Sequence, residues 1–312
     1  MKIVGVSFGT RDGSNDCMCK EALMGAQEMG AEVEFIHLHD WNIQHCTGCV
    51  ACSRALTMGK GNICSIKDDF DAFRSKLLDA DGVLFVSPIF ESGASGLLHT
   101  ICDRFGPRFD RGMNFMADGL AKAGKGKEID QRLLKDKVVS FIGIGGSDWT
   151  TRIQCDHAMV AMSPAWKIID NECFSWSKTI IMEDEKVARV HQIGVNLAKA
   201  AANYDEAKYM GAEGVCPHCH GRNFYLVPEE NKATCVLCGI EGKLDVVDGK
   251  FKFTFDDEWN IRAHDTMSGK KLHGDDVLNN EMRTINLPKD PEFIARKQKY
   301  KDFIQPTPAP SK

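Results

Sequence analysis

Five short apolar segments alternate with five amphipathic segments over the first 205 residues, and this alternation constrains the fold more than any other feature. The apolar segments have the length and β-branched content of buried strands, whereas the segments between them repeat their apolar residues at helical spacing. We expect strands at 2–6, 32–36, 82–86, 138–142 and 166–169, and helices at 16–29, 68–78, 95–105, 150–162 and 184–202. With right-handed crossovers, this order predicts an α/β fold with a doubly wound, five-stranded parallel sheet covered on both faces.

The charge balance and the apolar runs exclude several classes of protein. The chain has 39 Lys+Arg against 44 Asp+Glu, a formal net charge of -5, which argues against a polybasic nucleic-acid binder. The longest apolar runs, 82–90 and 138–145, are much shorter than the ~18 residues of a spanning helix. The first nine residues do not resemble a signal peptide. We therefore expect a cytoplasmic protein with neither a nucleic acid nor a membrane as its partner.

Composition changes along the chain suggest three parts. Residues 1–206 contain the strand and helix alternation, interrupted by a cysteine-rich loop at 45–64 and by a Gly-, Lys- and Asp-rich insertion at 106–137. Residues 213–255 contain a second cysteine group and short strand candidates at 224–227, 243–247 and 251–255. Residues 256–312 form a polar tail, expected to be extended. Its prolines at 306–310 cannot continue a helix, so we expect this end to fray or to dock on a partner subunit.

The loop after the first strand has the composition of an anion site. Small hydroxyl and glycine residues that lead into a helix offer backbone N–H groups, side-chain donors and the positive end of the helix dipole to a phosphate. The loop lacks both the dinucleotide and the triphosphate glycine patterns, which favours a mononucleotide. A capped turn, with Ser14 or Asn15 as the N-cap, is the alternative. The candidate ligands are Ser7, Thr10, Arg11, Gly13, Ser14 and Asn15.

Two further loops follow the third and fourth strands. Because the carboxyl ends of parallel strands meet at one edge of the sheet, all three loops open at the place where open α/β sheets bind ligands. Glycines there let the backbone approach a flat ring closely. The candidate residues are Pro88, Ile89, Phe90, Glu91, Ser92, Gly93 and Ser95 in the second loop, and Gly143, Gly145, Gly146 and Ser147 in the third.

Together these three loops resemble those of the flavodoxin-like NADPH-dependent FMN reductase family, over roughly residues 1–205. The resemblance rests on the first-loop residues, on Pro88-Ile89-Phe90 with Ser95-Gly96, and on the loop 143–146. It implies that the first loop binds the FMN phosphate, that the isoalloxazine lies between the other two, that NAD(P)H is the co-substrate, and that subunits form dimers or tetramers. Phe8-Gly9 and Asp16 depart from the family pattern, and an aspartate near a phosphate is unfavourable unless it points away.

The first cysteine group comprises Cys46, Cys49, Cys52 and Cys64. Three thiolates spaced C-x2-C-x2-C can bind three irons of a [4Fe-4S] cluster, and a distant fourth thiolate can complete it. The group, with Ile-Lys-Asp-Asp at 66–69, resembles the iron-sulfur flavoproteins, a branch of the same family. Eleven residues separate Cys52 from Cys64, which is more than in that branch. Buried or redox-active thiols without a cluster are the alternative.

The second cysteine group comprises Cys216, Cys219, Cys235 and Cys238. Two C-x2-C pairs separated by fifteen residues match a structural Zn²⁺ site with four thiolates, and the segment resembles a zinc ribbon. A rubredoxin-like iron site is the alternative. Residues 213–252 carry five basic and six acidic side chains, so no basic face is apparent. We expect this ribbon to contact protein, either as a lid on the flavin site or between subunits.

These observations favour an oxidoreductase in which NAD(P)H reduces FMN and electrons leave to an organic acceptor or an iron-sulfur centre. Because flavin supplies the chemistry, no catalytic acid or base has to be present, and none is identified. His157, Asp148 and the 106–137 insertion are candidate proton donors, with capping or surface roles as the alternative. A flavin and iron-sulfur electron carrier, or a redox-sensing zinc-ribbon regulator, are the other functions considered. The sequence pattern identifies neither the acceptor nor a preference between NADH and NADPH.

Overall fold

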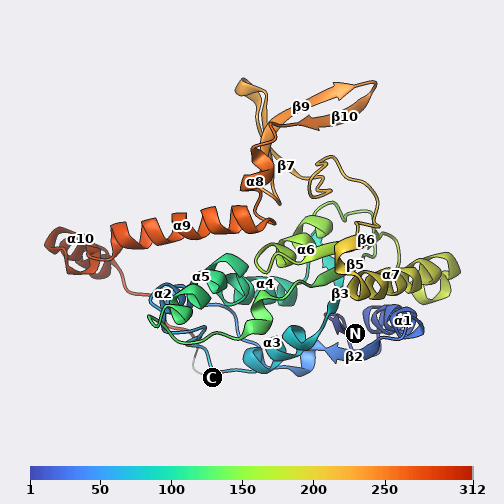
Figure 1. The fold of residues 1–312 in the computed structure, drawn as a ribbon, viewed down its shortest axis with the longest axis horizontal. Coiled ribbons are helices and arrows are strands. Elements are labelled where there is room, and N and C mark those ends of the chain that lie inside the picture. Colours follow the sequence, from blue (N-terminus) through green and yellow to red (C-terminus); the bar gives the residue numbers. More distant parts are fainter. Residues whose placement is uncertain (311–312) are drawn as a thin grey trace.

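The computed structural model describes residues 1–310 and confirms the predicted parallel sheet (Figure 1). Its parallel strands lie in the order β2-β1-β3-β5-β6, which is the flavodoxin-like order. A two-residue strand, β4, pairs with β3 in the antiparallel sense. The strands are β1 (Lys2–Ser7), β2 (Glu32–His37), β3 (Gly82–Phe90), β4 (Gly93–Ala94), β5 (Val138–Ile144) and β6 (Lys167–Phe174).

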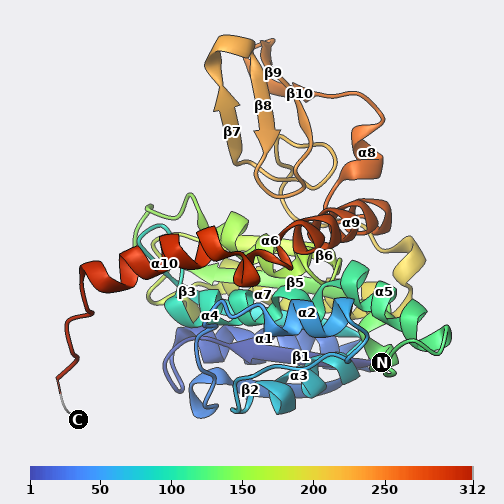
Figure 2. The ribbon, with the colours of Figure 1, turned by 90° about the vertical axis from the view of Figure 1, so that its left-hand side faces the viewer.

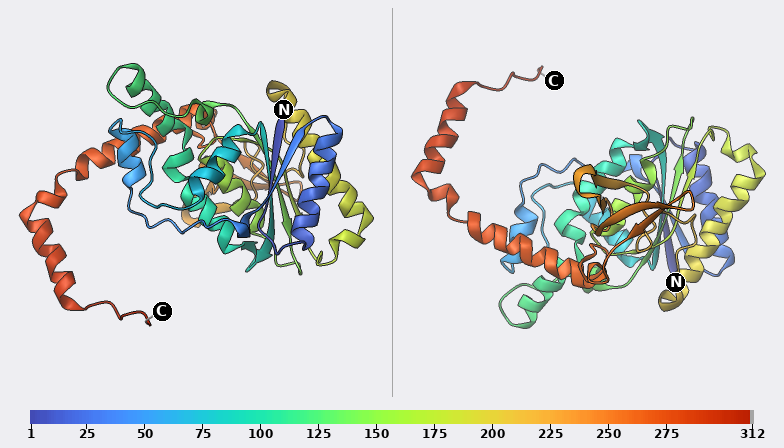
Figure 3. Two further views of the ribbon diagram at one scale, coloured as in Figure 1. Left: turned by 90° about the horizontal axis from the view of Figure 1, so that it is seen from below. Right: turned by 90° about the horizontal axis from the view of Figure 1, so that it is seen from above.

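Helices cover both faces of this sheet, as expected for a doubly wound fold. Helices α1 (Ser14–Glu28) and α7 (Asp184–Ala202) pack on one face, while α3 (Phe70–Asp79), α4 (Gly96–Phe109) and α6 (Ile153–Met162) pack on the other. The left view of Figure 3 shows these two layers on either side of the sheet. Between residues 1 and 310, no helix has both the length and the apolar character needed to cross a bilayer.

The insertion at 106–137, for which no helix was predicted, contains regular helical structure. Helix α4 continues past the predicted end through a kink at Gly106, and residues Arg111–Lys122 form a further helix, α5. The many Gly, Lys and Asp residues obscure a helical repeat of apolar residues at Met113, Met116 and Ala117. This repeat faces α2 (Ala51–Thr57), where Leu56 and Met113 share a small core.

A small antiparallel sheet follows the α/β part of the chain and projects from it (Figure 2). Its strands are β7 (Phe224–Val227), β8 (Lys232–Cys235), β9 (Glu241–Val247) and β10 (Lys250–Thr254), in the order β10-β9-β8-β7. Three of these strands were predicted from the sequence pattern, and β8 was not. Strand β8 has only four residues and begins with a lysine, so its pattern is too short and too polar to stand out.

The described part of the tail, residues 256–310, contains three α-helices in place of the extended chain that was predicted. They are α8 (Trp259–Arg262), α9 (Met267–Thr284) and α10 (Pro291–Phe303), and residues 304–310 have no regular secondary structure. Helix α9 is anchored to the body because Lys270 is buried and its Nζ lies 3.1 Å from Asp110 Oδ2. Helix α10 buries none of its residues and projects as an arm (Figure 3).

Within residues 1–310, six short 3-10 helices complete the fold. They are η1 (Leu38–Asp40), η2 (Gln131–Leu134), η3 (Ile180–Met182), η4 (Tyr204–Glu206), η5 (Pro228–Glu230) and η6 (Leu287–Lys289).

Candidate functional site

Four loops meet at the carboxyl edge of the parallel sheet and are joined by hydrogen bonds. The Ser14 hydroxyl donates to the Lys178 carbonyl at 3.0 Å, which connects the first loop to the residues after β6. The N–H of Ser177 donates to the Gly145 carbonyl at 2.8 Å, and the N–H of Arg152 donates to the Ser92 carbonyl at 3.0 Å. Segments far apart in the sequence therefore form one continuous rim.

The structure explains why Asp16 departs from the family pattern. Its side chain is buried and points into the protein, where it accepts the Asp12 N–H at 2.8 Å and lies 3.1 Å from His37 Nδ1. Burial opposes its ionisation, but hydrogen bonds from Ser7, Asp12 and His37 outweigh that cost, so the pKa of Asp16 lies below its ordinary value. Asp16 thus holds the loop in shape without facing the anion position.

The first loop has groups that fit a phosphate-bearing ligand. Helix α1 begins at Ser14, so the N–H groups of its first turn have no partner within the helix. Among residues 1–310, Asn15 Oδ1 is one of the few buried side-chain atoms that lack a hydrogen-bond partner. A Cβ at Gly9 would lie 2.6 Å from Asn15 Cβ, so only glycine leaves the space beside this amide. Free donors and an unpaired amide next to a helix N-terminus suit the FMN phosphate and ribityl chain.

The other candidates of the first loop differ in burial and in their partners. Ser7 is fully buried and its hydroxyl is engaged with Asp16 and the Gly9 N–H. Arg11 is exposed and its guanidinium forms an ion pair with Asp40, which is also exposed. Thr10 is exposed at the surface of the loop, and its Oγ1 lies beside Gly13.

The second loop begins with a tight hairpin. Ile89 and Phe90 on β3 pair with Ala94 and Gly93 on β4, so Glu91 and Ser92 form a two-residue turn. Both turn residues have positive φ, 47° and 63°, a conformation that glycine and asparagine adopt more easily. Beyond the turn, Ser95 Oγ is buried without a hydrogen-bond partner at the start of α4.

The third loop follows β5, and a fourth, which sequence analysis missed, follows β6. The stem of Lys178 covers Gly146, because a Cβ there would lie 2.6 Å from Lys178 Cε. Strand β6 was predicted to end at residue 169, since Asp170, Asn171 and Glu172 interrupt its apolar pattern. The signal that could have found the fourth loop is the run Ser175-Trp176-Ser177, which resembles the other loops in small hydroxyl residues.

His157 lies under this rim and is not placed to exchange protons with a substrate. It is fully buried, and its Nε2 is 2.7 Å from Ser87 Oγ and its Nδ1 3.3 Å from Asn171 Oδ1. Burial lowers its pKa to about 4, so the ring is neutral at pH 7. Asp148, the other named candidate, is exposed in the third loop.

The first cysteine group lies on an exposed loop and in the short helix α2. Cys46 and Cys49 are exposed, whereas Cys52 and Cys64 are partly buried. Within residues 1–310, these four thiols do not lie within ligand distance of one another as a set. A hydrogen bond from Ser65, at 3.3 Å, with further bonds from the loop lowers the pKa of Cys49 to about 7.

The Asp pair at 68–69 closes the base of this cysteine loop. Asp68 accepts the Gln44 N–H and Asp69 accepts the Asn42 N–H, both at 2.8 Å. Asp68 also pairs with the buried Arg104 at 2.5 Å. The motif that followed the cysteines in the sequence is therefore structural support for the loop.

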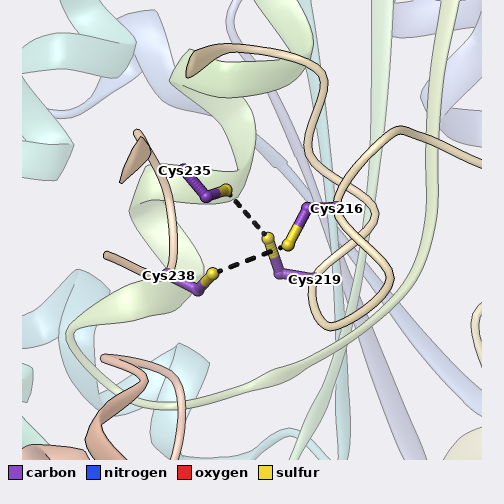
Figure 4. Close-up of side chains that lie close together, drawn as sticks. All are labelled: Cys216, Cys219, Cys235 and Cys238. Atoms are coloured by element: carbon purple, nitrogen blue, oxygen red, sulfur yellow. Dashed lines mark hydrogen bonds between the residues drawn. The ribbon is translucent and has the colours of Figure 1, made fainter. Parts of the chain in front are cut away.

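The second cysteine group forms a compact four-thiol site (Figure 4). Its four sulfur atoms lie within 4.8 Å of one another, with Cys216 to Cys238 at 3.8 Å and Cys219 to Cys235 at 3.5 Å. Zn–S bonds of about 2.3 Å in a tetrahedron place sulfur atoms roughly 3.8 Å apart, so the donor set fits zinc. His218 binds Asp265 at 2.8 Å and His220 binds Glu213 at 2.8 Å, so neither is needed as a ligand.

The sheet order and the four-loop rim define a flavodoxin-like flavin-binding protein. The model of the NADPH-dependent FMN reductase family matches residues 1–178, and the chain belongs to that family. It is an NAD(P)H-dependent flavin oxidoreductase, with FMN and NAD(P)H as the cofactors of its family. The pure electron carrier and the regulator considered from the sequence are set aside in favour of an enzyme.

Several proteins are similar to this chain. A solved structure of a flavone reductase is 51% identical, covers 99% of this chain and 100% of its own, and superposes with a TM-score of 0.89. A flavone synthase of Aspergillus candidus is 27% identical over 89% of this chain and 88% of its own length. An iron-sulfur flavoprotein of Methanocaldococcus jannaschii is 37% identical, but over only 34% of this chain and 53% of its own.

Proposed function

We propose that this protein reduces a flavone to its 2,3-dihydro derivative with NAD(P)H. The observation that carries the proposal is the full-length similarity to a flavone reductase, which includes the ribbon and the tail as well as the flavin domain. The iron-sulfur flavoprotein similarity, in contrast, covers about a third of this chain. The match to the flavone reductase includes the ribbon and the tail, which lie outside the flavin domain. This favours a shared acceptor as well as a shared cofactor.

Exposed aromatic residues at the rim support a planar aromatic acceptor. Phe90 ends β3, and Trp149 and Trp176 follow β5 and β6; they expose 61%, 60% and 66% of their surface. Trp176 also has a positive φ of 55° and donates its N–H to the Ser147 carbonyl at 3.3 Å, so its position is defined by the loop. Aromatic side chains beside a flavin site offer stacking surfaces to a flat ring system.

The proposed reaction balances with one nicotinamide and one proton. NAD(P)H and H⁺ convert the flavone C2=C3 double bond to two C–H bonds, and NAD(P)⁺ is released. FMN held by the loops of the rim would supply the hydride chemistry between the nicotinamide and C2, the β-carbon of the conjugated ketone. The protein orients the acceptor at the rim. His157 is neutral and enclosed, so the proton for C3 is expected from solvent.

Turnover with a flavone tests this proposal. We expect FMN-loaded protein to oxidise NAD(P)H under nitrogen in the presence of flavone and to form a product two hydrogens heavier, detected by mass spectrometry. A flavanone should be tested under air, because one similar protein is named for making a flavone. Rapid quinone reduction with no change in either flavonoid would contradict the proposal and leave the family assignment intact.

We infer that Ser14 and Asn15 bind FMN at the start of α1, because they border the free N–H groups of its first turn. The double substitution Ser14→Ala and Asn15→Ala is expected to raise the FMN dissociation constant at least tenfold, since two polar contacts are lost. Fluorescence titration of the apoprotein measures it. Asn280→Ala on the exposed surface of α9 is the control and should bind FMN normally.

The four thiols at 216–238 are proposed to hold one Zn²⁺, on the tetrahedral spacing of their sulfur atoms. Elemental analysis of purified protein should give about one zinc per chain. Iron in place of zinc would support the rubredoxin-like alternative.

The sulfur atoms of the first cysteine group do not lie within ligand distance of one another as a set, so we propose no electron path through them. Inorganic sulfide in anaerobically purified protein would show that a [4Fe-4S] cluster forms at Cys46, Cys49, Cys52 and Cys64.

We also propose that the chain forms a homo-oligomer through its C-terminal arm. Helix α10 exposes Tyr300 and Phe303 at 71% and 84% and buries none of its residues, although helices of this length are marginal in water without packing. Residues 286–310 carry five basic and three acidic side chains on a chain of net charge -5, so the rest of the chain is more acidic than the whole. Charge and apolar surface both suit a second copy as the partner.

A further inference from the structure

A cavity of about 480 Å³ lies between the α/β domain and the ribbon. One wall is formed by α6 and the carboxyl half of β6, and the other by the ribbon segment 219–223 with Leu237. This volume falls within the range of pockets that hold drug-sized ligands. No residue of the cavity was predicted from the sequence as part of the flavin site.

The cavity begins at the flavin rim. Thr150, which lines it, packs under the third loop, because a Cβ at Gly145 would lie 3.0 Å from Thr150 Cγ2. Thr150 Oγ1 also lies 3.1 Å from Ser175 Oγ in the fourth loop, and Ser175 lines the cavity as well. A molecule that occupies the cavity is therefore next to two of the four loops.

The lining has an apolar floor and a polar rim. Ala158 and Leu237 are buried at the floor, where residues of α6 share a core with the ribbon. At the side, Tyr209 stacks on His220 with ring centroids 4.2 Å apart and nearly parallel. Thr151 and Arg222 are exposed at the rim.

The polar groups of the cavity are fixed in place. Asn171 Nδ2 donates to the Gln154 carbonyl at 2.7 Å, and Gln154 Nε2 donates to the Asn171 carbonyl at 2.6 Å. These reciprocal bonds join α6 to β6 and hold the wall rigid. The Arg222 guanidinium donates to the Glu213 carbonyl at 2.9 Å through one nitrogen, which leaves its remaining N–H groups for a ligand.

We propose that this cavity binds the outer ring of the acceptor, a planar aromatic ring with hydroxyl or carbonyl substituents, so that the ribbon determines acceptor specificity. The apolar floor and the stacked Tyr209–His220 pair suit the flat ring, while Arg222 and the amides suit its oxygen substituents. This inference rests on the proposed function and names the place where its substrate is held. It also gives the ribbon a role that its structural metal alone does not.

Two rim variants test the inference. Thr151→Trp adds bulk at the mouth of the cavity, and Arg222→Ala removes a donor; both positions are exposed, so both proteins are expected to fold. We expect each to raise the KM for flavone at least tenfold, while the rate with ferricyanide and the KM for NAD(P)H stay unchanged. Thr254→Trp, exposed on β10 of the same ribbon, is the matched control and should behave as wild type.

Equilibrium binding of flavone to the oxidised protein separates this inference from the proposed function. If wild type reduces flavone and Thr151→Trp does so with unchanged KM, the cavity is not the acceptor site, although the function stands. If Thr151→Trp raises the KM for NAD(P)H alone, the cavity holds the coenzyme and the inference is wrong. If wild type binds flavone without reducing it and Thr151→Trp weakens that binding, the site stands and the function fails.

Discussion

At the scale of single residues, buried polar side chains decide the shape of the flavin rim. Asp16 and His37 form a buried pair beneath the first loop, and Ser87, His157 and Asn171 form a second buried chain beneath the third. Asn171 Nδ2 donates to Gln154, so its Oδ1 faces the histidine and accepts from Nδ1. His157 Nε2 then accepts the Ser87 hydroxyl, which is possible only in the neutral ring.

His157 should therefore make the protein sensitive to acid. Its pKa is lowered from 6.5 to about 4 by burial, so between these values the unfolded chain binds a proton that the folded chain does not. The contribution of His157 to the free energy of unfolding is therefore largest above pH 6.5. It falls by about 3 kcal/mol as the pH decreases toward 4. We expect His157→Gln to show a smaller loss of unfolding free energy between pH 7 and 4.5, measured by urea denaturation.

His191 serves as a control, because its effect on stability should change with pH in the opposite direction to that of His157. Hydrogen bonds to Glu21 and Glu28, on α1, raise its pKa, so its contribution is present below pH 6.5 and is lost as the pH rises through the raised value. His191→Gln should therefore remove stability in mild acid and little at high pH. An unchanged acid response in His157→Gln would show that another group controls the pH dependence.

At the scale of elements, α1 and α7 approach closely because both carry glycine at the contact. A Cβ at Gly194 on α7 would overlap the Ala22 carbonyl on α1, and a Cβ at Gly25 on α1 would overlap the His191 carbonyl. Both glycines are buried. The close approach keeps α1, and the loop in front of it, tightly against the sheet.

Substitution of these glycines tests that contact. Gly194→Ala is expected to lower the unfolding free energy by at least 1–3 kcal/mol, roughly the cost of overpacking, because backbone atoms cannot move aside. It should also weaken FMN binding by displacing α1. Gly119→Ala on the exposed face of α5 has no neighbour within 4 Å and should raise stability by up to about 1 kcal/mol. Equal stability of the two variants would contradict the close packing.

At the scale of the whole molecule, the thiol site lies where the ribbon packs against the body. Cys216, Cys235 and Cys238 belong to the same buried cluster as Cys155 and Ala158 of α6. The four-thiol site and the cavity therefore share one wall. Loss of the metal-binding cysteines should reduce turnover of the acceptor before it reduces binding of FMN.

Metal removal is expected to reduce flavone turnover without affecting FMN binding or ferricyanide reduction. Chelation should release the ribbon, because a site with four thiolates supplies much of the folding free energy of so small a sheet. We expect flavone turnover to fall at least tenfold while ferricyanide reduction and the bound FMN remain, as measured by steady-state rates and flavin absorbance. Equal loss of both activities would indicate that the ribbon supports the flavin domain itself.

The exposed surface of α10 leads to a prediction about the oligomeric state. Tyr300→Ser with Phe303→Ser removes exposed apolar surface from α10 and should shift the protein toward monomer, because that surface is then no longer buried between copies. Light scattering after size-exclusion chromatography measures this. Gln298→Ser with Asp302→Ser on the same helix is the control. A monomeric wild type would rule out the arm as an interface between copies.

The sequence by itself determined the parallel sheet, the three loops that were predicted at its edge and the four-thiol group, because strand and helix periodicity and ligand spacing are local properties of a chain. Only the tertiary structure decided that Asp16 points inward, that His157 is enclosed, and that Lys178 completes the rim beside Ser14. It also decided that Thr151 and Arg222 face one cavity. These arrangements depend on contacts between residues distant in the sequence, and no local pattern encodes them.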